Sequence, residues 1–230
     1  MSMTATTSRN ATPAQVALPA DPSLITRVIK RAVDITGSLA GLLVFAPLLL
    51  GCGVWIYLMD GRPIFYHQWR VGRDGWLYRI LKLRTMGNDA ERHGARFAQS
   101  DDPRVLPGCR WMRRSHVDEL PQLLNILAGQ MSLVGPRPER PEMLSALAEQ
   151  VPEVELRLAG QPGLTGLAQL RNGYTNDVDG ARRKLAYDLE YLRKRSVVGD
   201  IKLILEAIME SMEALGVTNF QAKAERVIAA

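Results

Sequence analysis

The segment "ITGSLAGLLVFAPLLLGCGVWIYLM", residues 35–59, constrains the fold of this chain most strongly, because it holds no charged residue. A helix of this length, rising about 1.5 Å per residue, is long enough to cross a hydrocarbon layer of roughly 30 Å. Pro47 stands near the middle of the run. A proline there removes a helix hydrogen bond and favours a kink or a break.

The flanks of this run are basic on both sides, so the distribution of positive charge gives no membrane orientation. The flanking basic residues are Arg27, Lys30, Arg31, Arg62, Arg70 and Arg73. Two arrangements fit these observations. One is a re-entrant helix–break–helix that enters and leaves by the same face, and the other is a spanning helix that tolerates its proline. A helix buried in a soluble core is disfavoured by the length.

The composition of the whole chain suits one domain with appendages. Hydrophobic residues make up 47% of the sequence, which is ample for a core. The formal charge of +5 predicts an anionic partner: a nucleic acid, a phosphorylated substrate or an anionic membrane face. Cys52 and Cys109 form no disulfide framework, which fits a reducing compartment. The cysteines and three scattered histidines form no zinc signature.

Four regions follow from these patterns. Residues 1–26 are rich in Thr, Ala, Ser and Pro and are predicted to be a disordered tail without the pattern of a secretory signal. Residues 27–60 are a basic lead-in and the membrane helix. No second apolar run of comparable length follows, so residues 61–215 are predicted to form a domain outside the bilayer. Residues 216–230 are predicted to be a C-terminal tail.

The predicted fold class is α+β and mostly helical. Residues 62–86 alternate in the manner of a short β-hairpin, with "GRDG" as its turn. Helices are predicted over 118–130, 141–158, 180–195 and 200–214, with a turn at 160–166. Some of these helices are amphipathic and are expected to lie on the membrane surface. The hairpin aromatics have two interpretations, a membrane interface or ordinary packing; they are Tyr66, Trp69, Trp76 and Tyr78.

The stretch "SHVDELPQLLN", residues 115–125, contains the adjacent carboxylates Asp118 and Glu119. Neighbouring helical positions diverge by about 100°, so the two side chains cannot share one direction, but they can do different jobs around one phosphate. One could attack phosphorus while the other holds Mg²⁺, which prefers oxygen ligands. The plain alternative is that Asp118 or Ser115 caps a helix, with Glu119 in its first turn.

Basic residues that suit phosphate surround this pair in the sequence. Arg113 and Arg114 precede it, and Arg137 lies between two prolines that restrict its backbone. Lys82 and Arg84 stand two residues apart and would share one side of a strand, as an anion-binding face or as a solvated edge.

Further candidates come later in the chain. The glycine-rich "QPGLTGLAQLRNGY" (161–174) offers Thr165, Gln169 and backbone amides that could form an anion nest. Asp200 is a polar candidate whose plain alternative is a charge on a helix surface.

Taken together, these motifs resemble the bacterial sugar transferases of the monotopic phosphoglycosyl transferase type. The resemblance covers roughly residues 27–208. It is carried by "KRAVD" (30–34), "RVGRDGWLYRILKLRTM" (70–86), "DELPQLLN" (118–125), "SLVGPRP" (132–138), "QPGLTGLAQLRNGY" (161–174) and "DIKLI" (200–204). The spacing of "DELPQLLN" to "SLVGPRP" is highly specific.

The resemblance implies a chemistry for these residues. Asp118 would attack the β-phosphate of a nucleoside-diphosphate sugar, most often a UDP-sugar, releasing UMP and forming a phosphosugar–aspartyl intermediate. Undecaprenyl phosphate would then accept the phosphosugar. Glu119 would hold Mg²⁺. The phosphate-binding residues would be Lys82, Arg84, Arg114 and Arg137.

The resemblance also implies a place in the cell. Lys30, Arg31 and Asp34 match the lead-in near the membrane face, and Pro47 matches the break of a re-entrant helix, which favours insertion into one leaflet. The enzyme would act at the cytoplasmic face of the bacterial inner membrane, starting exopolysaccharide or lipopolysaccharide assembly for downstream glycosyltransferases. No nucleic acid is involved, and a homodimer is possible.

Departures and alternatives remain at this stage. Many relatives have "TGW" where this chain has Gly166–Leu167, and "SLWLD" where it has "SVVGD" (196–200), which puts local interface packing in doubt but not the carboxylate pair. A hydrolase or a direct-displacement transferase could use the same pair. A non-catalytic membrane scaffold for anionic lipid or nucleotide is the other alternative, and it needs no fixed order of Pro, Asp, Glu and Arg. The sequence does not indicate which sugar is used.

Overall fold

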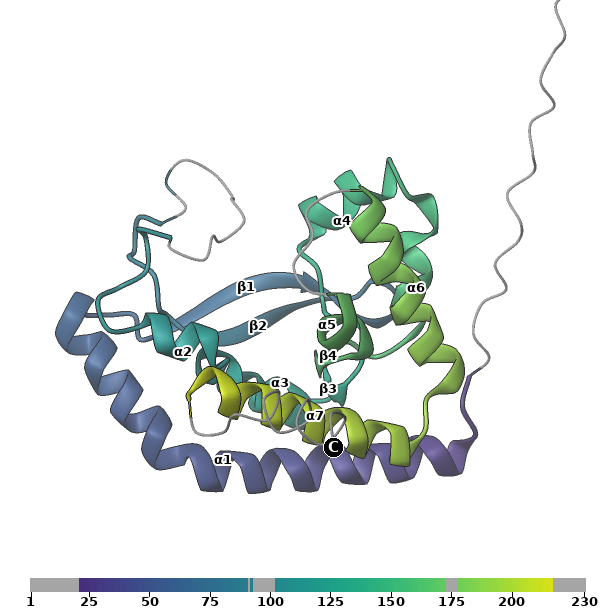
Figure 1. The fold of residues 1–230 in the computed structure, drawn as a ribbon, viewed down its shortest axis with the longest axis horizontal. Helices are drawn as coiled ribbons and strands as arrows, with labels where there is room; N and C mark the ends of the chain where they lie inside the picture. Colours follow the sequence, from purple (N-terminus) through teal and green to yellow (C-terminus); the bar gives the residue numbers. More distant parts are fainter. Residues whose placement is uncertain (1–20, 91, 93–101, 173–177, 217–230) are drawn as a thin grey trace, which may run out of the picture.

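The computed structural model describes residues 21–90, 92, 102–172 and 178–216 of the chain (Figure 1). One long helix, α1 (Leu24–Asp60), runs beneath a domain built mainly of short helices. Two small two-stranded sheets lie within the described part of that domain. The fold is therefore mostly helical with little sheet, as the sequence predicted. Two tails were predicted, over residues 1–26 and 216–230. Residues 1–20 of the first and 217–230 of the second lie outside the described residues.

Helix α1 begins three residues before the boundary predicted at 27. The Ser23 hydroxyl caps it by accepting a hydrogen bond from the Thr26 amide, 3.2 Å from N to Oγ. The helix ends at Gly61, whose φ of 64° favours glycine and whose amide donates to the Tyr57 carbonyl at 2.9 Å. Its 37 residues give a length of about 55 Å.

The break predicted at Pro47 is not present, and this part of the prediction was wrong. Pro47 lies inside one continuous helix, which bends in its second half (Figure 1). A proline removes a single hydrogen bond to the preceding turn, and the apolar residues on both sides keep the helix intact. Helix α1 is also the one candidate membrane span in the described residues. Only 17% of its most apolar stretch is buried within the protein.

The first half of α1 is anchored to the domain by its polar lead-in residues. The Lys30 ammonium donates to the Asp200 carboxylate at 2.6 Å and to the Val134 carbonyl at 3.1 Å. The Arg31 guanidinium donates to the carbonyls of residues 126 and 127, at 2.6 and 2.8 Å, where helix α3 (Leu123–Leu127) ends. Asp34 accepts from residues 132 and 133 of strand β3 (Ser132–Val134). These residues fix α1 to the domain.

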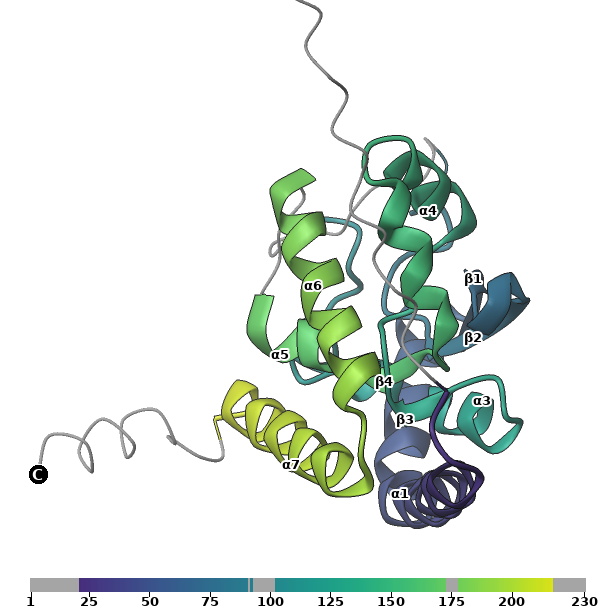
Figure 2. The same ribbon diagram turned by 90° about the vertical axis from the view of Figure 1, so that its right-hand side faces the viewer.

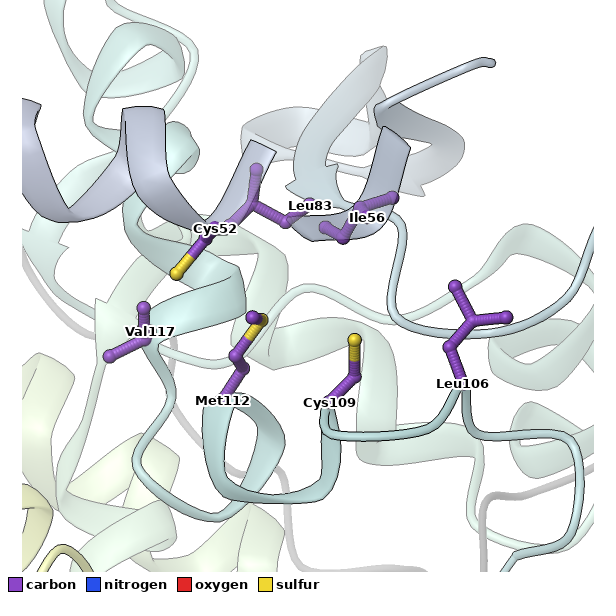
Figure 3. Packing of buried hydrophobic residues seen from close by; sticks show 7 residues of the cluster. All are labelled: Cys52, Ile56, Leu83, Leu106, Cys109, Met112 and Val117. Atoms are coloured by element: carbon purple, nitrogen blue, oxygen red, sulfur yellow. The ribbon is translucent and has the colours of Figure 1, made fainter. Parts of the chain in front are cut away.

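The second half of α1 is anchored to the same domain by apolar packing. Cys52 and Ile56 enter a buried cluster with Leu83 and with helix α2 (Arg110–Arg114) and its flanks (Figure 3). The cluster consists of Cys52, Ile56, Leu83, Leu106, Cys109, Met112 and Val117. The Trp55 indole N–H also donates to the Pro107 carbonyl at 3.1 Å. Both halves of α1 therefore contact one domain.

The predicted β-hairpin is confirmed. Strand β1 (Phe65–Val71) pairs antiparallel with β2 (Leu77–Leu83) across the 3₁₀ turn η1 (Arg73–Gly75). One face carries Tyr66, Gln68, Arg70, Tyr78 and Lys82 toward the interior. The opposite face is exposed at Phe65, His67, Trp69, Leu77 and Arg79, and buried at Val71 and Leu83. Of the hairpin aromatics, Tyr78 is buried, Tyr66 is half-buried, and Trp69 and Trp76 are exposed.

The single helix predicted over 118–130 is two elements, a 3₁₀ helix η2 (Val117–Gln122) and then α3. The helix predicted over 141–158 is likewise α4 (Pro141–Ala148) and the 3₁₀ helix η3 (Pro152–Ala159). A proline explains both corrections: Pro121 inside η2 and Pro152 at the start of η3 each lack an amide donor. The turn predicted at 160–166 contains strand β4 (Gly163–Thr165), which pairs parallel with β3.

The last helices cover the domain. Helix α5 (Leu167–Asn172) packs on α6 (Val178–Lys194), and α7 (Val197–Ala214) lies beside α1 (Figure 2). The helices predicted over 180–195 and 200–214 match α6 and α7 within three residues at each boundary. One side of α7 and the residue after it carry an exposed apolar row at spacings of three and four; the row is Val198, Ile201, Leu205, Ile208, Met212 and Leu215.

Candidate active site

The carboxylate pair lies in η2, directly after a sharp turn in the backbone. His116 begins η2 with a φ of 57°, a left-handed conformation, and makes no capping hydrogen bond. The Ser115 hydroxyl donates back to the Trp111 carbonyl at 2.7 Å. Neither Ser115 nor Asp118 therefore caps a helix, so the capping part of the plain interpretation is wrong, whereas its placement of Glu119 in the first turn is confirmed for η2. Asp118 and Glu119 are each only 6% exposed.

Glu119 is held by two cations from separate elements. The Lys82 ammonium on β2 donates to Oε1 at 2.7 Å. The Arg137 guanidinium donates to Oε1 at 2.7 Å and to Oε2 at 3.1 Å, a bidentate contact. These positive charges keep the pKa of Glu119 well below its usual value although burial opposes them. Glu119 is therefore a fixed carboxylate at the centre of the site.

Asp118 is buried beside Glu119 but lacks such partners. Across the described ranges its carboxylate makes no hydrogen bond and no ion pair. Burial, and then the negative charge of Glu119, raise the pKa of Asp118 to about 6, against the lowering effect of Lys82 and Arg113. An unpaired carboxylate with a raised pKa is typical of a reactive group.

Arg137 is placed by a close approach of two backbone segments. The Gly135 amide donates to the Thr165 carbonyl at 2.9 Å, and the Gly163 amide donates to the Pro136 carbonyl at 2.9 Å. A Cβ on Gly135 would lie 2.2 Å from the Gln161 carbonyl oxygen, and one on Gly163 would lie 2.1 Å from the Gly135 nitrogen. Only glycine fits at either position, so "VGPRP" and "PGLTG" form one joint.

That joint changes the role of the glycine-rich segment. The Gly163 amide is already bonded to the Pro136 carbonyl, and Thr165 lies in a strand rather than in a turn. The Gln169 amide donates to the Leu164 carbonyl at 3.3 Å, within the same segment. The Thr165 carbonyl and the Gln169 side chain thus make hydrogen bonds within the joint that carries Arg137.

Two predicted phosphate-binding residues are not brought to the pair. Arg84 directly follows the last residue of β2, and its side chain is bound at the end of α1 rather than at the carboxylate pair. Its guanidinium forms an ion pair with the Asp60 carboxylate and donates to the carbonyls of residues 60 and 61, at 3.1 and 3.0 Å, at the end of α1. Arg114 is exposed. Arg84 fastens a helix end, and Arg114 points to solvent.

Two further arginines lie at the site: Arg113, which the sequence analysis named beside the pair but did not assign to phosphate binding, and Arg70, which it did not connect with the pair. Arg113 donates to the Thr85 hydroxyl at 3.2 Å, and its charge lowers the pKa of Asp118. Arg70 is half-buried on the inner face of β1, and its charge acts on Arg137 and Glu119. The alternation of β1 could have identified Arg70. Tyr66 pairs with Lys82, and Arg70, four residues after Tyr66, lies on the same face of the hairpin. The sequence could not separate Arg113 from Arg114.

The remaining predicted residues anchor the structure. Lys30 and Asp200 form the ion pair described above, and the buried Tyr191 hydroxyl donates to Asp200 at 2.9 Å. Asp200 is therefore a buried junction between α1, α6 and α7, not a helix surface charge. Arg31 and Asp34 hold α1 at α3 and β3.

The oxygen donors fit the expected Mg²⁺. The described residues contain no group of three or more His, Cys, Asp or Glu placed for a metal. Mg²⁺ is usually held by one or two carboxylates and by substrate phosphates, so a pair suffices. A carboxylate has about four acceptor positions, and the bonds from Lys82 and Arg137 use three at Glu119. The free position on Oε2 and the unpaired Asp118 are suitable ligands.

Comparisons with known proteins agree on one family. The family model described as bacterial sugar transferase matches residues 25–214. A UDP-N-acetylgalactosamine-undecaprenyl-phosphate N-acetylgalactosaminephosphotransferase of Aeromonas hydrophila is 36% identical over 195 residues, 85% of this chain and 46% of that protein. A UDP-glucose:undecaprenyl-phosphate glucose-1-phosphate transferase of Caulobacter vibrioides is 38% identical, over 81% of this chain and 71% of that protein.

A shorter relative is matched over almost its whole length. The exopolysaccharide production protein PSS of Rhizobium leguminosarum is 39% identical, over 80% of this chain and 96% of that protein. This chain thus spans less than half of the Aeromonas protein and nearly all of the Rhizobium one.

Proposed function

The chain belongs to the bacterial sugar transferase family, and from this premise we propose that it transfers a sugar 1-phosphate from a nucleoside-diphosphate sugar to undecaprenyl phosphate. The observation that carries the proposal is the buried carboxylate of Asp118, which lacks a partner in the described chain and lies among cations. A non-catalytic scaffold has no need of such a group, because an unpaired buried carboxyl costs stability. The names of relatives containing undecaprenyl phosphate support the acceptor.

Two displacements at one phosphorus account for the reaction. In the first, an Asp118 oxygen attacks the β-phosphorus, the bond to the bridging oxygen breaks, and the nucleoside monophosphate leaves, UMP for a UDP-sugar. In the second, a phosphate oxygen of undecaprenyl phosphate attacks the same phosphorus. The Asp118–phosphorus bond breaks, the carboxylate returns, and undecaprenyl diphosphate sugar is formed. Both steps move phosphoryl groups only, so no oxidant or reductant is required.

The neighbours of Asp118 suit this chemistry. The raised pKa of about 6 makes Asp118 more basic than a free carboxylate while leaving it largely ionised at neutral pH. The guanidinium of Arg137 offers bidentate donors for phosphate oxygens, and Arg113 and Lys82 add positive charge. Mg²⁺, held by Glu119 and the donor phosphates, supplies charge neutralisation when bound.

The membrane arrangement proposed here is monotopic, at the cytoplasmic face of the inner membrane. Both halves of α1 are fixed to one domain, at Lys30 and Asp200 on one side and at Ile56 and Leu83 on the other. A helix that spans a bilayer places its two ends on opposite sides, so it could not keep both sets of contacts. A helix that dips into one leaflet keeps both, and its bend suits that path.

The apolar row on α7 supports the same arrangement. Its residues are exposed, from 36% at Met212 to 65% at Val198, and α7 lies beside α1 (Figure 2). An amphipathic helix of this kind can lie in the interface with its apolar side in lipid. The enzyme would then meet a lipid-bound acceptor and a water-soluble donor at one surface, as the first step of exopolysaccharide assembly.

A single-turnover assay tests the covalent route. The full chain in nanodiscs is mixed with Mg²⁺ and a panel of UDP-sugars, without acceptor. We expect one equivalent of UMP per enzyme with one sugar, and intact-mass analysis should show a phosphosugar adduct that is absent from Asp118→Asn. Continuous UMP release without acceptor would indicate a hydrolase. Release that needs the acceptor and leaves no adduct would indicate direct displacement.

The topology has its own test. Single cysteines replace Leu24 and the exposed Arg62, one at each end of α1, in sealed inverted vesicles. Cys52 and Cys109 are buried, so their background labelling by a charged maleimide is expected to be low. Labelling of both new cysteines from the cytoplasmic side is expected. Labelling of only one end from that side would contradict the monotopic arrangement and indicate a spanning helix.

A further inference from the structure

The loop that carries Arg137 is held by its backbone at every residue. Each of the four consecutive carbonyls of residues 136–139 accepts a hydrogen bond from outside the loop, at 2.8 to 3.2 Å. In chain order, the donors are the Gly163 amide, the Arg157 guanidinium, the Arg70 guanidinium and the Val71 amide. The hydrogen bond to the Arg137 carbonyl itself comes from Arg157, at 2.8 Å.

Arg157 is a buried cation with acceptors on more than one element. It lies in η3 and is 3% exposed. One nitrogen lies 3.3 Å from Glu139 Oε1, and another lies 2.7 Å from Asp188 Oδ2 on α6. Lys184 forms a second ion pair with Glu139. Charges buried this deeply are kept only when paired, so η3, α6 and the loop are tied together at this point.

The contact between Arg157 and Arg137 has a consequence for the active site. The two prolines beside Arg137 restrict its backbone, and the hydrogen bond from Arg157 fixes the carbonyl between them. With the main chain fixed, the guanidinium of Arg137 reaches Glu119 in bidentate geometry. We propose that Arg157 is a positioning residue that sets the direction of Arg137 toward the phosphate of the substrate. This inference rests on the proposed function.

The shape of the Arg157 side chain is part of the argument. The planar guanidinium of Arg157 contacts three acceptors at the same time. They are the Arg137 carbonyl and the carboxylates of Glu139 and Asp188. A lysine carries the same charge, but its point-like ammonium cannot reproduce the fork. Arg157→Lys therefore keeps the charge balance of the buried pairs and loosens the bond to the Arg137 carbonyl.

A double-mutant cycle tests whether Arg157 acts through Arg137. Arg157→Lys is measured in the wild-type background and in an Arg137→Ala background, with kcat, KM and thermal unfolding recorded for each. We expect Arg157→Lys to lower kcat/KM about tenfold when Arg137 is present and less than about twofold when it is absent. Equal effects in both backgrounds would overturn the inference, because the role of Arg157 would then be structural.

Arg84→Lys is the matched control. Arg84 is also buried and also donates to backbone carbonyls, but at the end of α1. Its effect on kcat/KM is expected to be the same in both backgrounds. Should Arg157→Lys fail to fold, Asp188→Asn removes one ionic partner of Arg157 and is run through the same cycle, with the same expected loss of effect in the Arg137→Ala background.

The two proposals fail in different ways. A wild-type chain that releases no nucleotide with any donor contradicts the proposed function. An active wild type whose cycle is additive contradicts only the role of Arg157. The cycle is also run on the Kd of UDP, measured by calorimetry without turnover. Coupling between Arg157 and Arg137 in that affinity supports the inference, and its absence opposes it.

Discussion

Two clusters of charge, each with a buried pair of residues, share the 136–139 loop and differ in the partners of their carboxylates. The first, the pair cluster, consists of Lys82, Asp118, Glu119 and Arg137. The second, the brace cluster, consists of Glu139, Arg157, Lys184 and Asp188. Every carboxylate of the brace cluster has an ionic partner, whereas Asp118 of the pair cluster has none in the described chain.

This difference appears in opposite pKa shifts. Lys184 and Arg157 lower the pKa of Glu139 to about 2, although burial opposes them. Burial and Glu119 raise the pKa of Asp118 to about 6. Ionised Glu139 therefore stabilises the fold, whereas ionised Asp118 costs stability, as is typical of a reactive group. The other carboxylate of each cluster shifts the opposite way, since the pKa of Glu119 is lowered and that of Asp188 is raised. The predictions below test this contrast, beginning with the largest expected effect.

Asp118→Asn is expected to abolish activity and to stabilise the protein. Removal of a nucleophile lowers the rate by at least about 10³-fold. The shift from 3.8 to about 6 means that ionised Asp118 opposes folding by up to about 3 kcal/mol at pH 8. Nucleotide release and denaturant unfolding measure the two effects. A variant that is inactive and also less stable would show that Asp118 has a structural role.

Glu139→Gln is expected to have the opposite effect on stability and to destabilise the protein. The pKa shift from 4.5 to about 2 corresponds to about 3 kcal/mol of stability at neutral pH. Urea unfolding should show a loss of that order, with Glu155→Gln, an exposed glutamate, changing it by less than about 0.5 kcal/mol. An unchanged free energy of unfolding for Glu139→Gln would mean that the brace cluster does not stabilise the fold.

Arg113 and Arg114 provide a matched pair of substitutions. Arg113→Gln removes a charge that lowers the pKa of Asp118, so kcat/KM should fall by about 100-fold and the acid limb of the pH–rate profile should move to higher pH. Arg114→Gln, at an exposed site, should change neither by more than about twofold. Equal changes in kcat/KM for the two variants would contradict the placement of Arg113 at the site and of Arg114 in solvent.

The pH dependence carries the smallest expected effect. The ionised fraction of Asp118 falls tenfold per unit below about pH 6, so kcat/KM should fall likewise. The stability that protonated Asp118 contributes is fully present below pH 3.8 and is lost as pH rises through about 6. That of Glu139 is present above pH 4.5 and is lost as pH falls toward about 2. The free energy of unfolding, measured against pH, should therefore show opposite trends for the two variants. As pH rises, Asp118→Asn should become more stable relative to wild type and Glu139→Gln less stable.

Local signals predicted the local elements well. The hairpin was found because alternation and "GRDG" are properties of neighbouring residues. The helices over 118–130 and 141–158 were wrong because each was extended across a proline, whereas the break at Pro47 was wrong because the helix continues through its proline. A proline can bend a helix, tighten it to 3₁₀ or end it, and tertiary packing selects among these.

The site was predicted less completely, for a physical reason. The contacts of Glu119 with Lys82 and Arg137 agree with the prediction that placed these residues together. Arg84 and Arg157 could not be assigned, because each acts on a backbone carbonyl far along the chain. A carbonyl is present at every residue, so no sequence pattern identifies which one an arginine binds. Glycine-rich motifs likewise conceal whether they face a ligand or another backbone.

The anchors of α1 also impose an order on biosynthesis. Lys30 and its partner Asp200 are separated by 170 residues. At a synthesis rate of about 5–20 residues per second, Lys30 is synthesised roughly 10–30 s before that partner exists. During this interval a long apolar helix must be sheltered by lipid or by a chaperone. The apolar helix is thus made first and fastened last, and premature release of the nascent chain would yield α1 without the domain that anchors it.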